Sequence, residues 1–562
     1  KQLPGITVDQ SGKITANGQT VKKVLVDGEE FFGDDPVLVT QNLRGDMIDR
    51  VQVFDKKSDQ AQFTGIDDGV KTKTINLKLK ADKNKGYFGK VDGGGASGEF
   101  FQGQGMVNSF RERSKVSAFT NLANTGRLGL NSSDNNKYGY AGALTFVEGG
   151  ITGVSAAGDE LSTSSGRYNG QGIPLARTAG AHFDGKWNNG SESLNMNYRV
   201  GSLNLDGERR STSQNNFPGA SVGANTSQSF ESYLFRQKLD ALYQLKLDTT
   251  SNLRVSVDGV IKSSRGRNSF QSLNFLNGDS LLNSGDRRIA DETEQSVFSS
   301  SVQYSQKFKK PRRTISLNLA HEINKSNIDG QLAVTNHFFA SGGFPGAVES
   351  IDQQKVNDLE SQLFSASLYY TEPISKTLSV SVNYGLGGVN GTAERSSFNK
   401  AASGSYDVLD QEFSNYLTHR QLSNMAGTTF QFRKNNQTVN FGTRLSLVRF
   451  TQHDLKTDLV YRRRFMYWFP QASYRFEFSK NRLLSASYNG STVQPRIDQI
   501  QPIKINNDPL NIVLGNPDIN PGFKNNLTVD YSSFKVLTGE SLNLGAYYTL
   551  VTNPVVFSIL TN

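Results

Sequence analysis

The feature that most constrains this chain is a strict alternation of apolar and polar side chains over long stretches. In one stretch, five apolar residues occupy every second position: Leu239, Ala241, Tyr243, Leu245 and Leu247. The same period recurs near residues 253–257, 315–319, 378–384, 472–478 and 542–546. A period of two places alternate side chains on opposite faces of a β-sheet. The alternation therefore predicts many strands, each with one apolar face.

The composition restricts where those apolar faces point. Hydrophobic residues are only 36% of the 562 residues, and no stretch approaches the roughly 18 consecutive apolar residues of a spanning helix. Gly (54), Phe (35) and Tyr (20) are the kind of residues that strands and turns use. A transmembrane barrel combines a polar average with lipid-facing apolar residues, because polar residues face its lumen. A large soluble all-β protein would have the same composition, so composition alone leaves both possibilities open.

Charge and cysteine content exclude several kinds of site. The net charge of +9 is spread over the whole chain, whereas nucleic-acid binding requires a basic cluster. We therefore expect no nucleic-acid partner. The chain has no cysteine, which excludes disulfides, thiolate metal sites and cysteine nucleophiles.

The connections between the expected strands favour the barrel. Short turns are expected at 248–252, 373–376, 434–436 and 479–481. Long polar connections are expected at 125–177, 206–227, 264–293, 328–357, 395–412 and 490–523. Short turns at one end and long loops at the other are typical of transmembrane barrels. We expect about 17 or 18 strands.

Residues 1–83 lack the long alternating strands and show shorter elements instead. The barrel is expected to occupy residues 84–562. Three short strands are expected, at 24–26, 50–54 and 74–79, the first of them ending in the turn Asp27-Gly28. Asp35-Pro36 is typical of a helix start, with Asp as the N-cap and Pro at the first helical position. These elements predict a small α+β domain before the barrel.

Five segments near the N-terminus form a recognisable series: Leu3–Val8, Gly12–Gly18, Val24–Gly28, Ile48–Val53 and Thr74–Lys80. Together these segments resemble the plug of TonB-dependent outer-membrane receptors. A narrower resemblance, to the receptor-like barrels common in Bacteroidetes, rests on four more: Phe31–Pro36, Asp55–Gly69, Asn507–Ile512 and Gly515–Pro521. The segments cover both ends of the chain and occur in the order of the family.

The resemblance implies a receptor in the bacterial outer membrane. Extracellular loops would bind a scarce ligand, and a TonB-type periplasmic protein would energise its import through the plugged barrel. The implied partners are outer-membrane lipid, the energy-coupling protein, an unidentified small ligand or oligomer, and a surface lipoprotein. The alternative is a structural or assembly subunit of a secretion or surface complex that transports no nutrient.

Two departures from the family pattern lead us to expect a fragment. We find no TonB box before the plug-like segments, and the last residues, Ile559–Asn562, read as part of a strand. Large plugged transporters have about 22 strands, a few more than we expect here. An open barrel would leave unpaired backbone groups in lipid. We therefore expect the sequence to lack both ends of a longer protein.

Three patterns that suggest chemistry have simpler interpretations. Gly93–Gly98 satisfies the dinucleotide fingerprint, but no helix is expected after it, so we interpret it as small residues in the first barrel strand beside the plug. Asp67-Asp68-Gly69 is more typical of a turn than of a cation site. The histidines lack metal-ligand spacing: His182, His321, His337, His419 and His453.

We accordingly expect no catalytic, cofactor or metal site, no cofactor, and no enzyme activity; the ligand-binding residues stay unassigned. Aromatic residues at strand ends are expected to form the interfacial girdles of the barrel rather than a ligand platform. These residues are Tyr467, Trp468, Phe469, Tyr547 and Tyr548.

Overall fold

The structure is a computed structural model, and most of the strand-forming chain is described in it. The barrel region is described at residues 85–127, 144–147, 150–154, 168, 170–217, 219–278, 280–340, 344–479, 482–493, 504–505, 513–514, 516, 518–534 and 540–556. Before it, the described residues are 6–8, 14–16, 19–21, 23–30, 45–57, 62–63 and 71–80. No helix in the described residues is long and apolar enough to cross a membrane.

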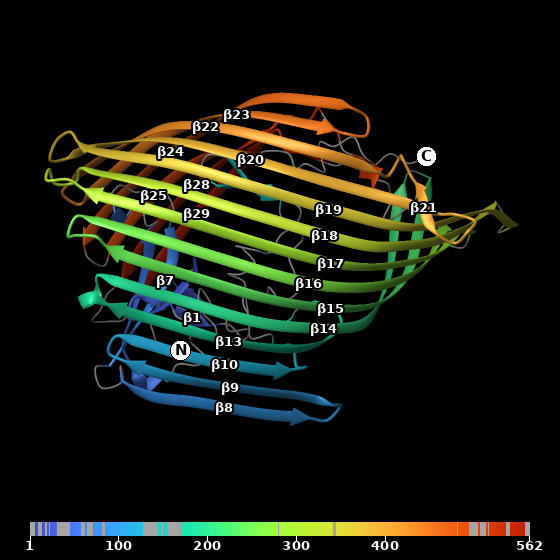
Figure 1. Ribbon diagram of the computed structural model, residues 1–562, viewed down its shortest axis with the longest axis horizontal. Helices are drawn as coiled ribbons and strands as arrows, with labels where there is room; N and C mark the ends of the chain where they lie inside the picture. The colour runs from blue at the N-terminus through green and yellow to red at the C-terminus, as the bar shows by residue number, and fades with distance from the viewer. Residues whose placement is uncertain are drawn as a thin grey trace.

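Eighteen strands of the described residues form one closed antiparallel barrel, in agreement with the expected strand count. Strands that follow one another in the barrel order lie side by side, as β13 to β19 show (Figure 1). The order closes with β8 next to β29. The strands are β8 (Gly86–Ala96), β9 (Phe100–Arg111), β10 (Ser114–Ala123), β13 (Ile173–Trp187), β14 (Glu192–Phe217), β15 (Ala220–Lys246), β16 (Ser251–Leu276), β17 (Ser280–Lys307), β18 (Thr314–Ala340), β19 (Phe344–Pro373), β20 (Leu378–Lys400), β21 (Tyr406–Leu409), β22 (Asn415–Lys434), β23 (Gln437–Asp454), β24 (Leu459–Ser479), β25 (Arg482–Val493), β28 (Gly522–Phe534) and β29 (Ser541–Thr552). The remaining short elements near the barrel are η2 (Asn188–Gly190), β11 (Leu144–Val147), β12 (Gly150–Val154), β26 (Lys504–Ile505) and β27 (Val513–Leu514).

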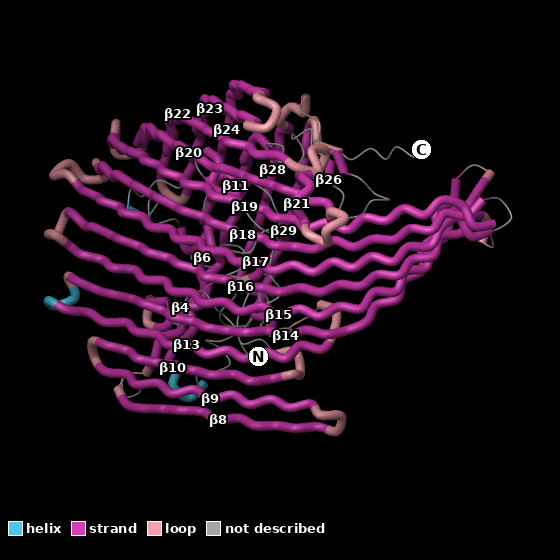
Figure 2. The backbone as a smooth tube through the Cα atoms, turned by 45° about the vertical axis from the view of Figure 1, so that its right-hand side comes forward, coloured by secondary structure: helices cyan, strands magenta, loops and turns pink. Residues whose placement is uncertain are grey.

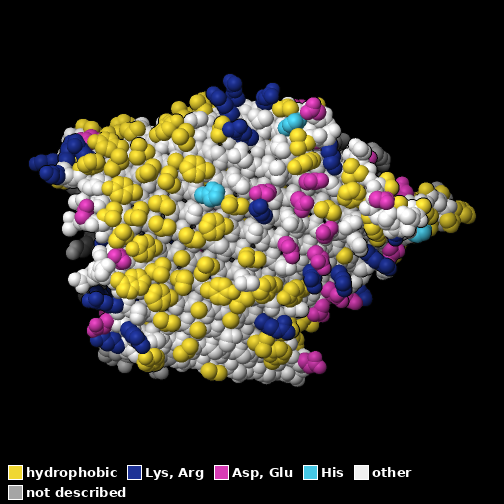
Figure 3. Space-filling model, viewed as in Figure 1, with side chains coloured by type: hydrophobic (Ala, Val, Ile, Leu, Met, Phe, Trp, Pro, Cys, Tyr) yellow, Lys and Arg dark blue, Asp and Glu magenta, His cyan; other side chains and the backbone are white. Residues whose placement is uncertain are grey.

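The two faces of the barrel wall have opposite polarity. Leu239, Phe298 and Phe364 point outward and are 41%, 45% and 53% exposed. On the inner face, which we call the lumen face, His182 and Asn197 are buried and hydrogen-bonded to each other at 2.6 Å. A space-filling view shows apolar side chains spread over the outer face of the strands (Figure 3). An apolar exterior around a polar interior is the arrangement that a lipid environment requires.

The long connections expected from the sequence are wrong in three places, and a fourth, 395–412, is largely the hairpin of β20 and β21. The described residues of 206–227, 264–293 and 328–357 belong to the paired strands β14–β15, β16–β17 and β18–β19. Strands β14 to β19 are therefore 26 to 30 residues long, against about 9–11 residues that cross a membrane. Their ends project beyond the rest of the wall (Figure 2). Beyond the membrane both faces meet water, so the strands continue without apolar alternation.

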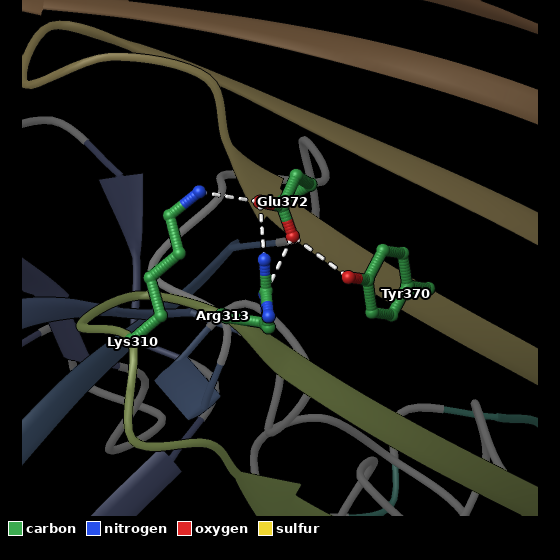
Figure 4. A network of polar contacts seen from close by, with 4 residues as sticks. All are labelled: Lys310, Arg313, Tyr370 and Glu372. Carbon is green, nitrogen blue, oxygen red and sulfur yellow. Dashed lines mark hydrogen bonds and ion pairs between the residues drawn. The ribbon is translucent and has the colours of Figure 1, made fainter.

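The opposite end of the barrel has the short turns that the sequence predicts. The expected turns at 248–252, 373–376 and 434–436 each join two neighbouring strands, while 480–481 lie outside the described residues. Another turn at this end, between β17 and β18, is tied to the end of β19 by ion pairs. Glu372 accepts hydrogen bonds from Arg313 Nε (2.7 Å), Lys310 Nζ (2.5 Å) and the Tyr370 hydroxyl (2.7 Å), as Figure 4 shows. We call this end the short-turn end.

The N-terminal residues form two small sheets. One contains β1 (Ile6–Val8), β2 (Ile14–Ala16) and β3 (Gln19–Thr20). The other has the order β5-β4-β7-β6, with β4 (Lys23–Val26), β5 (Glu29–Glu30), β6 (Ile48–Lys57) and β7 (Lys71–Leu79), and a 3-10 turn, η1 (Gly45–Met47), precedes β6. The three strands expected here are confirmed; the helix expected at Asp35-Pro36 lies outside the described residues. We call β1 to β7 the N-terminal sheets.

Candidate functional site: the lumen wall and the N-terminal sheets

The N-terminal sheets pack against the lumen face of β9 and β10. Met106, Phe110 and Phe119 project from these two strands and are 6%, 2% and 5% exposed. They belong to the same apolar cluster as Val24, Ile75 and other core residues of the N-terminal sheets. The two parts therefore share one core, to which the described residues of the barrel contribute three buried side chains.

A polar contact lies beside this shared core. Lys115 of β10 reaches the turn after β4, where its ammonium lies 3.5 Å from the Asp27 carboxylate and 3.2 Å from the Val26 carbonyl oxygen. Asp27 adopts a φ of 55° in the turn that the sequence predicts at Asp27-Gly28. Its carboxylate also accepts a hydrogen bond from the Leu79 backbone N–H at 3.1 Å. The same carboxylate thus ties the turn to β7 and to the barrel wall.

Gly180 of β13 makes room for the aromatic ring at the centre of this contact. Gly180 pairs with Phe119 across β10 and β13. A Cβ at this glycine would lie 2.4 Å from the Phe119 ring. The ring therefore covers the glycine on the lumen face, and this position holds the side chain against the N-terminal sheets.

A cavity of about 360 Å³ lies between another N-terminal segment and the wall, at the short-turn end. Gln62 and Phe63 line one side of it. The wall side is basic, with Lys186, Lys246, Arg254 and Lys307 among its lining residues. The Lys307 ammonium lies 5.6 Å from the centroid of the Phe63 ring, a cation–π distance.

The lumen wall beyond the N-terminal sheets carries a chain of polar contacts. Asn197 donates a hydrogen bond to Asp240 at 2.6 Å, and the Arg199 guanidinium lies 3.7 Å from the same carboxylate. Lys238, 6% exposed, lies 3.9 Å from it. Such a wall suits a polar solute, because it offers donors and acceptors rather than apolar surface.

A second polar network lies on the lumen face at the opposite end from the short turns. Gln353 donates to Asn399 at 2.9 Å and to Asp410 at 3.0 Å, and Asn399 donates to Asp410 at 3.1 Å. Lys355 lies two residues along β19, and its ammonium is 6.0 Å from the Phe413 ring. Burial lowers the pKa of Lys355 to about 8, and repulsion from the Arg395 guanidinium acts in the same direction. Attraction to the Asp410 carboxylate raises this pKa and offsets part of the effect. This network combines donors, acceptors and an aromatic ring, which is a surface for a hydroxyl-rich or anionic ligand.

The structure separates the aromatic residues that we expected to form girdles. Trp468 lies on the outer face, 50% exposed, and donates to Thr443 at 2.6 Å, as a girdle residue does. Tyr548 shares the outward face of β29 with Leu542 and Leu544, whereas its neighbour Tyr547 is exposed on the opposite face. Tyr467, however, is 1% exposed on the lumen side, and Phe469 lies under the Arg444 guanidinium. The girdle expectation is wrong for Tyr467, Phe469 and Tyr547, because neighbouring residues in a strand face opposite sides.

The other sequence patterns do not form sites. Gly93 to Gly95 lie in β8, where the described neighbours of an added Cβ belong to β9, and no described residue of the N-terminal sheets lies within 4 Å of it. Asp67-Asp68-Gly69 lie outside the described residues. Among the residues that the structure describes, no three His, Asp or Glu side chains gather in a way that would hold a metal ion. The two polar networks and the basic cavity were not predicted, since their members come from many strands and share no sequence motif.

Comparison with known proteins supports an outer-membrane barrel. Residues 306–562 match the model of the outer membrane protein beta-barrel family. No curated protein matches the chain in sequence. The family match, the closed barrel and the apolar outer face place the protein in the bacterial outer membrane.

Several solved structures are similar to the chain. The ferric yersiniabactin uptake receptor of Yersinia pestis is 9% identical, with a TM-score of 0.32, over 98% of this chain and 85% of that one. The siderophore receptor PiuA of Acinetobacter baumannii is 10% identical, with a TM-score of 0.31, over 98% and 86%. The ferric preacinetobactin receptor of the same species is 11% identical, with a TM-score of 0.26, over 94% and 92%. At TM-scores below 0.5, these likenesses add nothing to the fold that the strand pairing establishes.

Proposed function

We propose that the protein is a receptor that binds a scarce ligand and imports it. The ligand binds at the end of the barrel opposite the short-turn end, where β14 to β19 project (Figure 2), and we call this end the long-strand end. In this proposal the N-terminal sheets are the plug of residues 1–83, and a TonB-type periplasmic protein supplies the energy by pulling on them. The sequence resemblance to receptor-like barrels of the Bacteroidetes type supports the proposal. Binding takes place without catalysis.

The observation that carries the proposal is the small contact between the N-terminal sheets and the wall. In the described residues the shared core has only Met106, Phe110 and Phe119 on the barrel side, and Lys115 adds one ion pair. The barrel strands, in contrast, are joined by continuous hydrogen-bonded ladders of up to 26 residue pairs. A part with few contacts opens at a lower free energy than the part around it. A pulling force would therefore displace the N-terminal sheets while the barrel stays closed.

The two polar networks of the lumen support a polar cargo. The network of Gln353, Asn399 and Asp410 lies at the long-strand end, where a ligand would arrive, and the Asp240 network lies further inside. A solute with hydroxyl or anionic groups would form hydrogen bonds first with the outer network and then with the inner one as it passes through the lumen. We therefore favour a polar ligand over an apolar one.

The experiment is to lock the N-terminal sheets to the wall. Asp27→Cys and Lys115→Cys place two thiols in a chain that has no other cysteine, and a short reducible bifunctional reagent bridges them. The matched control is Lys325→Cys with Glu360→Cys, which replaces an ion pair of 3.2 Å between two strands of the wall. Uptake is followed with ferric siderophores carrying radioactive iron and with fluorescent oligosaccharides and peptides.

We expect uptake of one probe class to stop when positions 27 and 115 are crosslinked and to return on reduction. The wall crosslink should have no effect, and a protonophore should abolish uptake by the unlocked protein. Uptake that continues through the locked protein or without an energised membrane would refute the proposal. So would the absence of uptake for every probe class, which would favour a structural role.

A further inference from the structure

Four arginines form a compact patch on the outer face of β22, β23 and β24. Arg449 is the direct cross-strand partner of Arg464, and Arg462 lies two residues before Arg464 on the same face. Arg420 pairs with Thr451, which in turn pairs with Arg462. Directly opposed residues have Cβ atoms about 4.5–5.5 Å apart. All four side chains are exposed, and Figure 3 shows Lys and Arg side chains gathered at the top of this face, where Figure 1 labels β22 and β23. We call these four residues the arginine patch.

The patch begins where the apolar surface ends. On β23 the outward side chains from Val439 to Leu447 are mostly apolar, and Arg449 is the next outward residue. On β24 the apolar series ends at Met466, which is 68% exposed, and Arg464 follows. The stretch between the short turn at 435–436 and Arg449 is close to the roughly 9–11 residues that cross a bilayer. The arginine patch therefore lies at the membrane boundary on the side away from the short turns, which in these barrels is the extracellular side.

Elsewhere at this membrane boundary, charged side chains on the outer face of the barrel form ion pairs. Arg265 of β16 lies 3.2 Å from Glu292, and Lys325 of β18 lies 3.2 Å from Glu360. In the arginine patch, by contrast, none of the four guanidinium groups forms an ion pair with a carboxylate of the described residues. Like charges directly opposed across two strands are destabilising, so the patch needs an anion from outside the chain. Its position next to lipid-facing apolar side chains identifies where that anion comes from.

We propose that the arginine patch binds the phosphate groups of a lipid headgroup in the outer leaflet. Guanidinium groups bind phosphate through two parallel hydrogen bonds, and they suit this role better than ammonium groups. Two phosphates of one headgroup would neutralise the opposed pair Arg449 and Arg464 together with the neighbouring Arg462 and Arg420. The acyl chains would lie along Leu447, Met466 and Trp468. The bound lipid would hold this part of the wall without entering the lumen.

The test uses the full chain purified in detergent and native mass spectrometry. The probes are a bisphosphorylated lipid A, the same lipid without phosphates, and inorganic phosphate as a competitor. The variant is Arg449→Gln with Arg464→Gln, and the control is Arg265→Gln, which removes an outward arginine at the same level. Heat-dependent gel mobility shows that each variant forms the folded barrel.

We expect wild type and Arg265→Gln to retain the bisphosphorylated lipid equally, and the double variant to bind it at least about tenfold more weakly, since it loses two charge-assisted contacts. Equal retention of the lipid without phosphates would overturn the proposal, because the apolar surface would then explain binding. Complete displacement by millimolar inorganic phosphate would also overturn it, because the patch would then be a general anion site. An equal loss of lipid binding in Arg265→Gln would also overturn the proposal, because any outward arginine would then suffice.

Discussion

Lys115, on the lumen face of β10, reaches 3.5 Å to the carboxylate of Asp27, in the turn between β4 and β5 of the N-terminal sheets. Both side chains are largely shielded from water, at 14% and 27% exposed. The Asp27 carboxylate also orders its own turn through the Leu79 N–H. Asp27 thus stabilises a turn within the N-terminal sheets and also attaches these sheets to the barrel wall.

Asp27→Asn should weaken this attachment selectively. The amide keeps an oxygen for the Leu79 N–H but leaves the Lys115 ammonium without its countercharge, which we expect to cost about 1–3 kcal/mol. Hydrogen exchange of β7 should accelerate while exchange of β14 to β19 stays unchanged. Glu360→Gln, in an exposed pair of the wall, should change exchange much less, since exposed pairs contribute about 0–1 kcal/mol. Equal acceleration in β7 and in the wall would contradict the selective attachment.

Gly180→Ala should disturb the same contact from the barrel side. The added methyl group would meet the Phe119 ring at 2.4 Å and force it out of the shared core, at about 1–3 kcal/mol for overpacking. Gly259→Ala is the matched control, because nothing lies within 4 Å of its added Cβ. Protease cleavage of the N-terminal sheets should become faster in the first variant only. Unchanged cleavage in Gly180→Ala would show that Phe119 does not hold the sheets.

The strands of the wall could be predicted from the sequence because every second side chain faces lipid and must be apolar. Around residues 239–247 this rule fixes both the strand and the side chain that faces outward. The hairpins at 264–293 escaped prediction because outside the membrane no such rule applies, and paired strands there look like polar loops. Tyr467 and Phe469 show the limit of a residue-type argument: an aromatic residue indicates a girdle only if its position in the alternation points outward.

The site was less predictable than the fold. Gln353, Asn399 and Asp410 come together from β19, β20 and the segment after β21. Their proximity depends on which residues of neighbouring strands pair with one another. The alternation of apolar and polar residues fixes only which face of the sheet each side chain lies on, so it leaves several registers open. Asp27-Gly28 was predicted as a turn, but its attachment to Lys115 joins residues that are far apart in the chain, and no local pattern reports such a contact. Long-range register thus accounts for what the sequence left open.

Asp248→Ala should loosen the turn between β15 and β16. The Asp248 carboxylate accepts hydrogen bonds from the Thr250 N–H (2.6 Å), the Thr250 hydroxyl (2.7 Å) and the Ser251 N–H (2.7 Å). These bonds lower the pKa of Asp248 from 3.8 to about 2, so their contribution is present above pH 3.8 and is lost as the pH falls toward 2. Hydrogen exchange at this turn should therefore be faster in the variant at neutral pH. Asp248→Asn keeps an acceptor and should lie between wild type and alanine; an alanine variant indistinguishable from wild type would contradict the role of the carboxylate.

Lys355 should make the long-strand end of the barrel more stable at alkaline pH. Its pKa is lowered from 10.5 to about 8 in the folded protein, chiefly by burial. Between these two values the unfolded chain binds more protons than the folded one, so stability rises with pH from about 8 and levels off near 10.5.

Lys355→Met removes the titrating group and keeps most of the side-chain volume, so this rise should disappear. Urea unfolding in detergent between about pH 8 and pH 10.5 measures the slope, and Lys325→Met, an exposed lysine of the wall, serves as the control. A slope that persists in Lys355→Met but not in Lys325→Met would place the titrating group outside the network of Gln353, Asn399 and Asp410.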